Sequence, residues 1–190
     1  KNQKMIAIAS STGGAEALTK VLTELPKDSP PIVIVQHMPT GFTKLFADRL
    51  NGICNIEVRE AQSNDQIKQG LALIAPADNH MVVKKRGSMF ITECFVGKKL
   101  HGVMPAADIL FESVSNVVKE NAVGVVLTGM GADGGKGLKM MKDNGARTIG
   151  QNKATCVVYG MPKVAFDLGA VDIELPLSEI AHTMLQFAKE

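Results

Sequence analysis

Three short apolar segments of this chain each lead into a residue that can take part in acyl transfer. The residues are Ser11, His37 and Asp133, and the segments before them are Met5–Ala9, Pro31–Val35 and Ala122–Leu127. Short Val, Ile and Leu runs predict buried parallel strands, whose carboxyl ends meet at one edge of the sheet, where α/β folds place their chemistry. A hydroxyl, an imidazole and a carboxylate at that edge would be a nucleophile, its general base and the group that orients the base.

Ser11 lies in the segment Ala9–Gly13, which fits a small-x-Ser-x-Gly pattern at a predicted strand-to-helix turn. Such an elbow requires small neighbours, because the nucleophile sits on a sharp turn that bulky side chains would block. Two alternatives stay open. Ser and Thr before a helix commonly act as N-caps. A loop of small residues that opens a helix can also bind an anion, although neither the dinucleotide nor the phosphate-loop glycine pattern occurs here.

His37 precedes Pro39 and Gly41, which favour a tight turn into the next helix; by itself it fits a structural histidine as well as a base. Asp133 is the only acid in the glycine-rich segment 128–137. Its Asp-Gly pair is typical of a simple turn, whereas the glycines would also let backbone N–H groups face a cleft and stabilise an oxyanion or bind phosphate. The remaining histidines follow no predicted parallel strand; they are His80, His101 and His182.

Apolar periodicity and turn residues predict the elements that must position these side chains. The expected helices are 14–25, 42–50, 105–121, 135–144 and 177–190. The expected strands are 5–9, 32–36, 56–61, 71–75, 81–85, 89–95, 122–127 and 147–151, the four middle ones in an antiparallel excursion with a hairpin tip at 86–88. We expect one domain over residues 1–190, with an α/β fold: a mostly parallel, doubly wound sheet, helices on both faces and a small antiparallel excursion in the middle.

Composition narrows the functional class. The net charge of +2 and the short basic clusters at 84–86 and 98–99 do not favour a nucleic-acid partner. The three cysteines, Cys54, Cys94 and Cys156, form no Cys-x-x-Cys pair, which argues against a zinc site or a disulfide framework and fits a reducing compartment. No apolar stretch approaches the roughly 18 residues of a membrane helix, and residues 1–4 lead straight into a strand without a signal peptide. We expect a cytoplasmic protein that does not insert into membranes.

Several longer motifs carry a resemblance to a known family. They are STGG at 11–14, QHMPTGFTKLFADRLN at 36–51, IAPADNHM at 74–81, NAVGVVLTGMGADGGKGL at 121–138 and QNKATCVVYGMP at 151–162. Through them the chain resembles, from Met5 to Leu177, the catalytic domain of the bacterial chemotaxis protein-glutamate methylesterases. The resemblance implies an α/β fold with a mostly parallel sheet. It places the catalytic triad on Ser11, His37 and Asp133, a backbone contribution to the oxyanion pocket on Met130, and Thr12 beside the nucleophile.

The implied reaction is hydrolysis of glutamate methyl esters on methyl-accepting chemotaxis receptor helices, with release of methanol, and deamidation of receptor glutamines. It calls for no metal and no organic cofactor. The family commonly carries an amino-terminal receiver domain whose phosphorylation relieves inhibition, and no such domain lies within these 190 residues. Either the chain is a fragment or its regulation differs.

Some positions depart from the family pattern. Ala9 and Ser10 stand where glycine and alanine are usual, which makes Ser10 a second serine at the elbow. Lys153 replaces an acidic residue, and the segment 104–108 reads MPAAD where RPSVD is usual. These two departures affect the expected substrate contacts more than the triad. The rival function is a nucleotide- or phosphate-binding α/β module that uses the loops at 10–14 and 129–137. A non-catalytic binding domain with the same fold is the third possibility.

Overall fold

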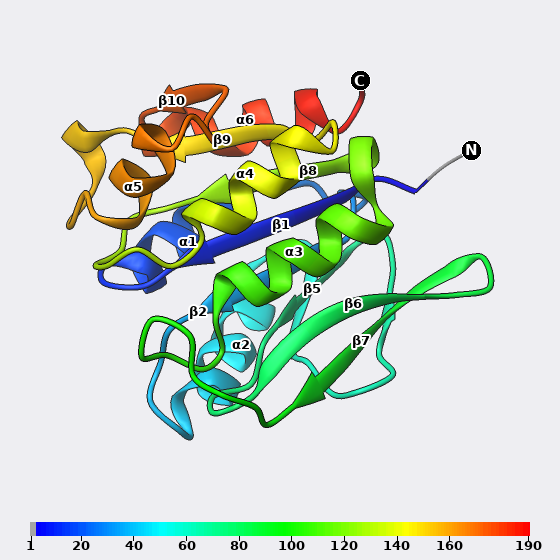
Figure 1. Cartoon of the computed structure of the whole chain (residues 1–190). Helices are drawn as coiled ribbons and strands as arrows, with labels where there is room; N and C mark the ends of the chain where they lie inside the picture. The colour runs from blue at the N-terminus through cyan, green and yellow to red at the C-terminus, as the bar shows by residue number, and fades with distance from the viewer. Residues whose placement is uncertain (1–2) are drawn as a thin grey trace.

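Seven parallel strands form the central sheet (Figure 1). The computed structural model of the protein describes residues 3–190, so Lys1 and Asn2, on which the signal-peptide expectation partly rests, lie outside it. The strand order is β10-β9-β8-β1-β2-β5-β3, and every neighbouring pair is parallel. The bounds are β1 Met5–Ser10, β2 Ile32–Gln36, β3 Glu57–Glu60, β5 Leu71–Ile74, β8 Ala122–Val126, β9 Arg147–Gln151 and β10 Ile173–Leu175.

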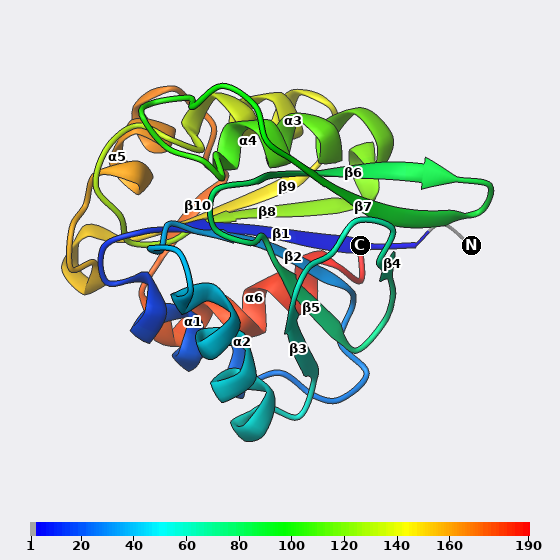
Figure 2. The same cartoon turned by 90° about the horizontal axis from the view of Figure 1, so that it is seen from below.

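Helices cover both faces of this sheet (Figure 2). On one face lie α1 Gly14–Thr23, α2 Phe42–Ile53 and α6 Leu177–Phe187, and on the other lie α3 Ala107–Val117, α4 Gly135–Asp143 and α5 Met161–Asp167. The predicted doubly wound α/β fold is therefore confirmed. The helix expected over 105–121 is shorter, because Lys119 adopts a left-handed φ of 57° and the chain continues as the 3-10 turn η1 Lys119–Asn121.

The strand side chains alternate between two buried cores, as the period of two in a strand requires. In β1 the odd positions Met5, Ala7 and Ala9 pack toward α3 and α4, while Ile6 and Ile8 pack toward α1 and α6. All five side chains are buried. Burial on both faces is what gives a central parallel strand its continuous apolar sequence.

A second, three-stranded antiparallel sheet lies beside α3. It consists of β4 Gln66–Ile67, β6 His80–Arg86 and β7 Met89–Phe95 in the order β4-β7-β6. The predicted hairpin tip at 86–88 is therefore correct. The middle segments 56–61 and 71–75, expected to be antiparallel, instead belong to the parallel sheet as β3 and β5. A four-residue strand is too short for its sequence to indicate the direction of its partners.

The strand order explains why the loops that carry Ser11, His37 and Asp133 lie around one crevice. From β1 the chain crosses to β2 on one side, whereas β8 lies on the other side of β1. Such a reversal leaves a crevice at the carboxyl ends of the strands. The register aligns Ser10 with Gln36 and Ala9 with Val126, so the loops after these strands start level with one another.

Close packing of α3 against α4 depends on Gly137. A Cβ added there would lie 2.6 Å from the Cβ of Phe111 and 3.0 Å from the Cα of Asp108. We expect Gly137→Ala to lower the free energy of unfolding by about 1–3 kcal/mol, because buried atoms must move to admit the methyl group.

Urea unfolding followed by circular dichroism measures this effect. The matched control is Gly52→Ala on α2, where an added Cβ meets nothing within 4 Å. That change is expected to be neutral or to stabilise by up to about 1 kcal/mol, since alanine is the better helix former. Equal stability of the two variants would contradict the close approach at Gly137.

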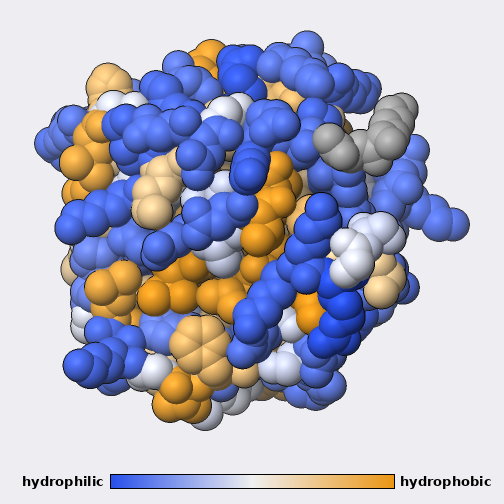
Figure 3. Space-filling model, turned by 45° about the vertical axis from the view of Figure 1, so that its right-hand side comes forward, coloured by the Kyte–Doolittle hydropathy of each residue, from blue (hydrophilic) through white to orange (hydrophobic). Residues whose placement is uncertain are grey.

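Figure 3 shows an end of the molecule away from this crevice. Polar side chains cover most of the view, and apolar residues gather near its centre. Among residues 3–190, no helix combines the length and the apolar character that a membrane crossing needs.

Candidate active site

The ends of β1 and β2 place Ser11 and His37 at the start of neighbouring loops. The backbone N–H of His37 donates to the carbonyl of Ser10 at 3.2 Å, which continues the parallel pairing by one residue. On the other side of β1, the N–H of Ser11 donates to the carbonyl of Thr128 at 3.0 Å. The predicted serine, histidine and glycine-rich loops therefore share one edge of the sheet.

His37 and Asp133 form a direct pair. The Nε2 of His37 lies 2.8 Å from the Oδ2 of Asp133, whose side chain is only 2 % exposed. Asp133 also accepts hydrogen bonds from the N–H groups of Ala107 at 2.6 Å and Asp108 at 3.0 Å. These two residues begin α3, so the carboxylate lies at a helix N-terminus, where unpaired N–H groups and the helix dipole favour a negative charge.

The Ser11 hydroxyl contacts the same loop. The N–H of Met130 donates to the Oγ of Ser11 at 3.0 Å, and Met130 is 66 % exposed. The glycine-rich loop thus delivers both the Asp133 carboxylate and an N–H group that reaches the serine oxygen. Within residues 3–190, the Ser11 hydroxyl and the His37 ring are not hydrogen-bonded to each other. Such contacts are often long before substrate binds and tighten only in the substrate complex.

Ser10 and Ser11 have different environments. Ser10 is fully buried and donates its hydroxyl to the Oε1 of Gln36. The Nε2 of Gln36 donates in turn to the carbonyls of Ser11 at 2.9 Å and His37 at 3.2 Å. One buried amide therefore joins the peptides of both site residues. Sequence reasoning missed Gln36, because its position at the end of a strand did not indicate which groups its side chain would reach.

The turn into α1 does not use a serine or threonine cap. Gly13 is the N-cap residue, with a left-handed φ of 81° and no side-chain hydrogen bond. The N-cap interpretation of the Ser11-Thr12 pair is therefore wrong. Thr12 takes part through its backbone instead, since its carbonyl accepts the hydroxyl of Thr128 at 3.0 Å. This contact ties the serine loop to the start of the glycine-rich loop.

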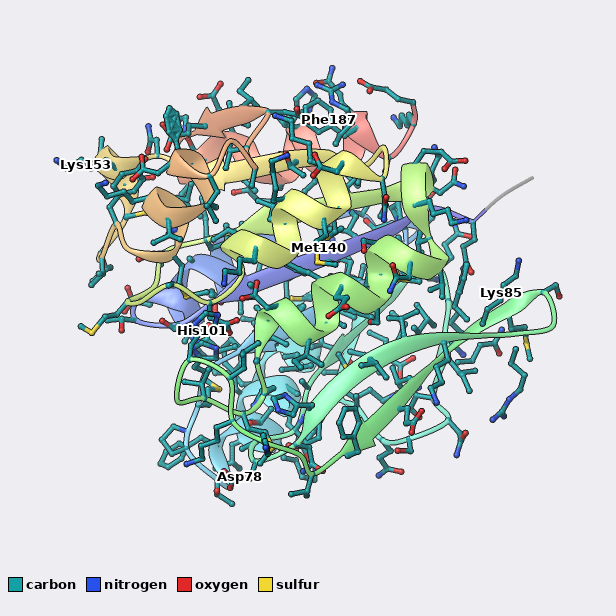
Figure 4. All side chains as sticks on the ribbon, viewed as in Figure 1. Asp78, Lys85, His101, Met140, Lys153 and Phe187 are labelled. Atoms are coloured by element: carbon teal, nitrogen blue, oxygen red, sulfur yellow. The ribbon has the colours of Figure 1, made fainter. Side chains whose placement is uncertain are left out.

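A second histidine–carboxylate pair lies behind Asp133. The Nε2 of His101 is 2.7 Å from the Oδ2 of Asp108, and the Oδ1 of Asp108 accepts the N–H groups of Gly134 at 3.0 Å and Gly137 at 2.8 Å. Figure 4 shows His101 at the beginning of α3. The sequence does not indicate a role for His101, because this residue follows no predicted parallel strand. Nor does the sequence mark Asp108 as a site residue.

These groups are the strongest candidates for metal ligands among residues 3–190. One ligand atom each from His101, Asp108 and Asp133 lie within 4.8 Å of one another. All four carboxylate oxygens of Asp108 and Asp133 are already hydrogen-bonded. Their partners are the imidazoles of His37 and His101 and backbone N–H groups. The helix N-termini that supply those N–H groups disfavour a cation. The arrangement therefore favours a hydrogen-bonded network over a metal centre.

An open groove adjoins His37. Its volume is about 280 Å³, and residues 37–39 and 102–105 line it together with Asp78 and Lys99. Met104 and Pro105, in the stretch that departs from the family pattern, thus form part of its wall. Lys153, the other departure, is exposed in the 3-10 turn η2 Lys153–Thr155 and lies in Figure 4 at a distance from Asp78.

Burial disfavours the reactive thiolate form of all three cysteines, because it raises the pKa of each thiol. All three thiols are free. Burial raises the pKa of the Cys94 thiol and of the Cys156 thiol to about 11 in each case. Because the reactive form of cysteine is the thiolate, these two protonated side chains are poorly reactive.

Comparison with known proteins identifies the family. The family model described as CheB methylesterase matches residues 6–184. The chain belongs to the CheB methylesterase family. A protein-glutamate methylesterase/protein-glutamine glutaminase 2 from Syntrophomonas wolfei is 50% identical over 186 residues, which cover 98% of this chain and 54% of the relative. A protein of the same activity name from Sulfurimonas denitrificans is 50% identical over 177 residues, or 93% of this chain and 50% of the relative.

This member of the CheB methylesterase family also matches a solved structure. The crystal structure of the Thermotoga maritima CheB methylesterase catalytic domain aligns with a TM-score of 0.95 and 38% sequence identity. The alignment covers 98% of this chain and 99% of that one. The chain spans about half the length of the curated relatives that it matches.

Proposed function

We propose that this chain hydrolyses glutamate methyl esters through a serine nucleophile, with Ser11, His37 and Asp133 as the catalytic residues. The observation that carries the proposal is the glycine-rich loop, which pairs Asp133 with His37 and gives the Met130 N–H to the Ser11 hydroxyl. In a phosphate-binding loop the backbone N–H groups would face an anion, whereas here the Met130 N–H donates to the Ser11 hydroxyl.

The orientation of the His37 ring supports a specific sequence of proton transfers. Its Nε2 faces the Asp133 carboxylate, an acceptor, so the neutral ring carries its proton on Nε2 and leaves Nδ1 free as a base. As the Ser11 oxygen attacks the ester carbonyl, Nδ1 takes the hydroxyl proton, and Asp133 stabilises the resulting imidazolium. The same proton passes to the leaving methoxide, which departs as methanol. Water then hydrolyses the acyl-enzyme by the reverse sequence of proton transfers.

The Met130 N–H is the proposed oxyanion donor. It already lies 3.0 Å from the Ser11 oxygen that would attack the carbonyl. The carbonyl oxygen of a bound ester would develop its negative charge next to the same donor, and one such donor is worth roughly 10²–10³ in rate. Thr12 supports this geometry through its carbonyl, which is bound to Thr128. No step calls for a metal or an organic cofactor.

The proposed substrates are glutamate methyl esters on the helices of methyl-accepting chemotaxis receptors. The names of the relatives combine glutamate methylesterase with glutamine glutaminase activity, and we extend both to this chain. Deamidation would proceed through the same acyl-enzyme, with ammonia as the leaving group. A protein substrate needs an accessible site, and the exposed Met130 and the open groove beside His37 are consistent with this.

The experiment uses chemoreceptor preparations that carry radiolabelled methyl esters, mixed with the purified chain, and measures volatile methanol. We expect release by the wild-type protein and none above background with Ser11→Ala. Absence of release by the folded wild-type protein would refute the proposed activity. Binding of inorganic phosphate at the loops 10–14 and 129–137, without ester cleavage, would favour the anion-binding module instead.

Gln36 is expected to matter for turnover without touching substrate. Gln36→Leu removes the donor that holds the carbonyls of Ser11 and His37 and leaves the Ser10 hydroxyl without its acceptor. We expect kcat to fall by about 10- to 100-fold, because small displacements of reacting groups are costly. Steady-state kinetics measure the effect. The control is Gln69→Leu, whose amide is exposed and bonds only to the Asp28 carbonyl. Equal turnover of the two variants would exclude a positioning role for Gln36.

A further inference from the structure

Two histidine–carboxylate pairs are joined back to back in this molecule. His37 binds the Asp133 carboxylate, and His101 binds the Asp108 carboxylate in the same way, at 2.8 and 2.7 Å. The backbone N–H of Asp108 links the pairs, because it donates to the Oδ1 of Asp133. Both carboxylates are more than nine-tenths buried.

The two aspartates cap each other's helices. Asp133, just before α4, accepts the first N–H groups of α3. Asp108, in the first turn of α3, accepts the N–H groups of Gly134 and Gly137 at the start of α4. Since Gly134 follows Asp133 directly, Asp108 fixes the backbone of the loop that carries both the Asp133 carboxylate and the Met130 N–H.

His101 connects this network to the wall of the groove. It lies in a tight turn in which Leu100 and Val103 exchange two backbone hydrogen bonds of 3.0 Å. His101 itself has a left-handed φ of 55°, which a non-glycine residue adopts only when its surroundings hold it. The next residues along the chain, 102–105, line the groove beside His37. The bond from His101 to Asp108 therefore anchors the groove wall to the residue that holds the glycine-rich loop.

We propose that the groove beside His37 binds the substrate, that Asp108 is a positioning residue for the Asp133 loop, and that His101 couples the groove wall at 102–105 to that loop. This inference rests on the proposed esterase function. Asp108 acts on turnover, because displacement of its loop moves Asp133 and Met130 away from His37 and Ser11. His101 acts on substrate binding, because its loss frees the wall while the bonds of Asp108 to Gly134 and Gly137 remain.

The test separates kcat from KM for receptor methyl-ester hydrolysis. Asp108→Ala is expected to lower kcat by about 10- to 100-fold, because it removes Oδ1, the single acceptor of both loop N–H groups. Asp108→Asn retains one oxygen for those groups and should restore kcat to within roughly threefold of wild type. His101→Leu is expected to raise KM by roughly three- to tenfold with kcat unchanged, since one charge-assisted hydrogen bond is lost. Asp108→Asn should raise KM by less than His101→Leu does, because its uncharged amide can still hydrogen-bond the Nε2 of His101 but lacks the charge of the carboxylate.

The matched control is His182→Leu, which alters an exposed histidine on α6 and should change neither constant. Wild-type kcat in folded Asp108→Ala, or His101→Leu kinetics identical to those of His182→Leu, would overturn the proposal. If Asp108→Ala does not fold, the KM values of Asp108→Asn and His101→Leu test the proposal, and wild-type KM in both variants would overturn it.

Amide hydrogen exchange gives a readout that does not depend on activity. The Gly134 and Gly137 amides should exchange about tenfold faster in Asp108→Ala than in Asp108→Asn, because only alanine leaves them without an acceptor. Equal exchange in the two variants would overturn the role of Asp108 in holding the loop. If Ser11→Ala keeps full turnover, the proposed esterase mechanism fails, while the exchange result still reports whether Asp108 holds the loop.

Discussion

Ser11→Ala is expected to lower kcat for methyl-ester hydrolysis by about 10⁴- to 10⁶-fold, the range found when a serine nucleophile is removed. Without the hydroxyl no acyl-enzyme forms, and the remaining rate comes from binding and from the oxyanion donor. The melting temperature should hardly change, because Ser11 lies at the sheet edge and its hydroxyl is bonded only to the Met130 N–H. Methanol release and thermal unfolding measure the two effects.

Ser10→Ala is the control in the same elbow. Ser10 is fully buried, and its hydroxyl is bound to the buried Oε1 of Gln36, which the variant would leave without a donor. This variant should lose about 1–3 kcal/mol of stability and retain most of its turnover. The reverse outcome, with Ser11→Ala active and Ser10→Ala inactive, would move the nucleophile by one residue.

The second large effect is expected for Asp133→Asn, with kcat lower by about 10⁴-fold, as for the same exchange in a serine-protease triad. An amide that donates toward the Nε2 of His37 would force the ring proton onto Nδ1, the nitrogen proposed to accept the Ser11 proton. The side-chain oxygen of asparagine can still accept an N–H group from the start of α3, so most of the fold should persist. Single-turnover kinetics separate the slower acylation from any change in binding.

Asp143→Asn provides the comparison at an exposed carboxylate of α4. Asp143 pairs only with Lys139, one turn earlier on the helix surface, and pairs of this kind contribute little. Its turnover should equal that of the wild type. Acylation by Asp133→Asn at a rate within tenfold of this control would contradict the assigned role of the His37–Asp133 pair.

The sequence predicts well which residues meet at the carboxyl ends of the strands, because the pattern that indicates each strand is local. The strands before Ser11 and His37 and before the glycine-rich loop are short apolar runs buried on both faces, and such runs need only local pattern to be recognised. Parallel strands bring the loops at their carboxyl ends to one edge of the sheet. The resemblance to the methylesterases then distinguishes Ser11 from Ser10, a distinction that the pattern of small residues alone does not make.

The sequence does not predict contacts that form only when distant segments pack. Asp108 reaches Gly134 and Gly137 across 26 and 29 residues, and Gln36 reaches Ser11 across 25. These polar side chains follow no local pattern that indicates their partners. The sequence does not indicate the contact of His101 with Asp108 for the same reason, since that contact depends on the packing of the His101 turn against α3. The direction of β3 and β5 likewise depends on neighbours that are distant in the chain.

Covalent labelling tests the serine nucleophile most directly. A serine-directed fluorophosphonate is added to the native protein, and mass spectrometry locates the adduct within the peptide that carries both Ser10 and Ser11. We predict one adduct, on Ser11, formed much more slowly in Asp133→Asn. An adduct on Ser10, or full ester hydrolysis by protein that takes up no label, would contradict the serine mechanism.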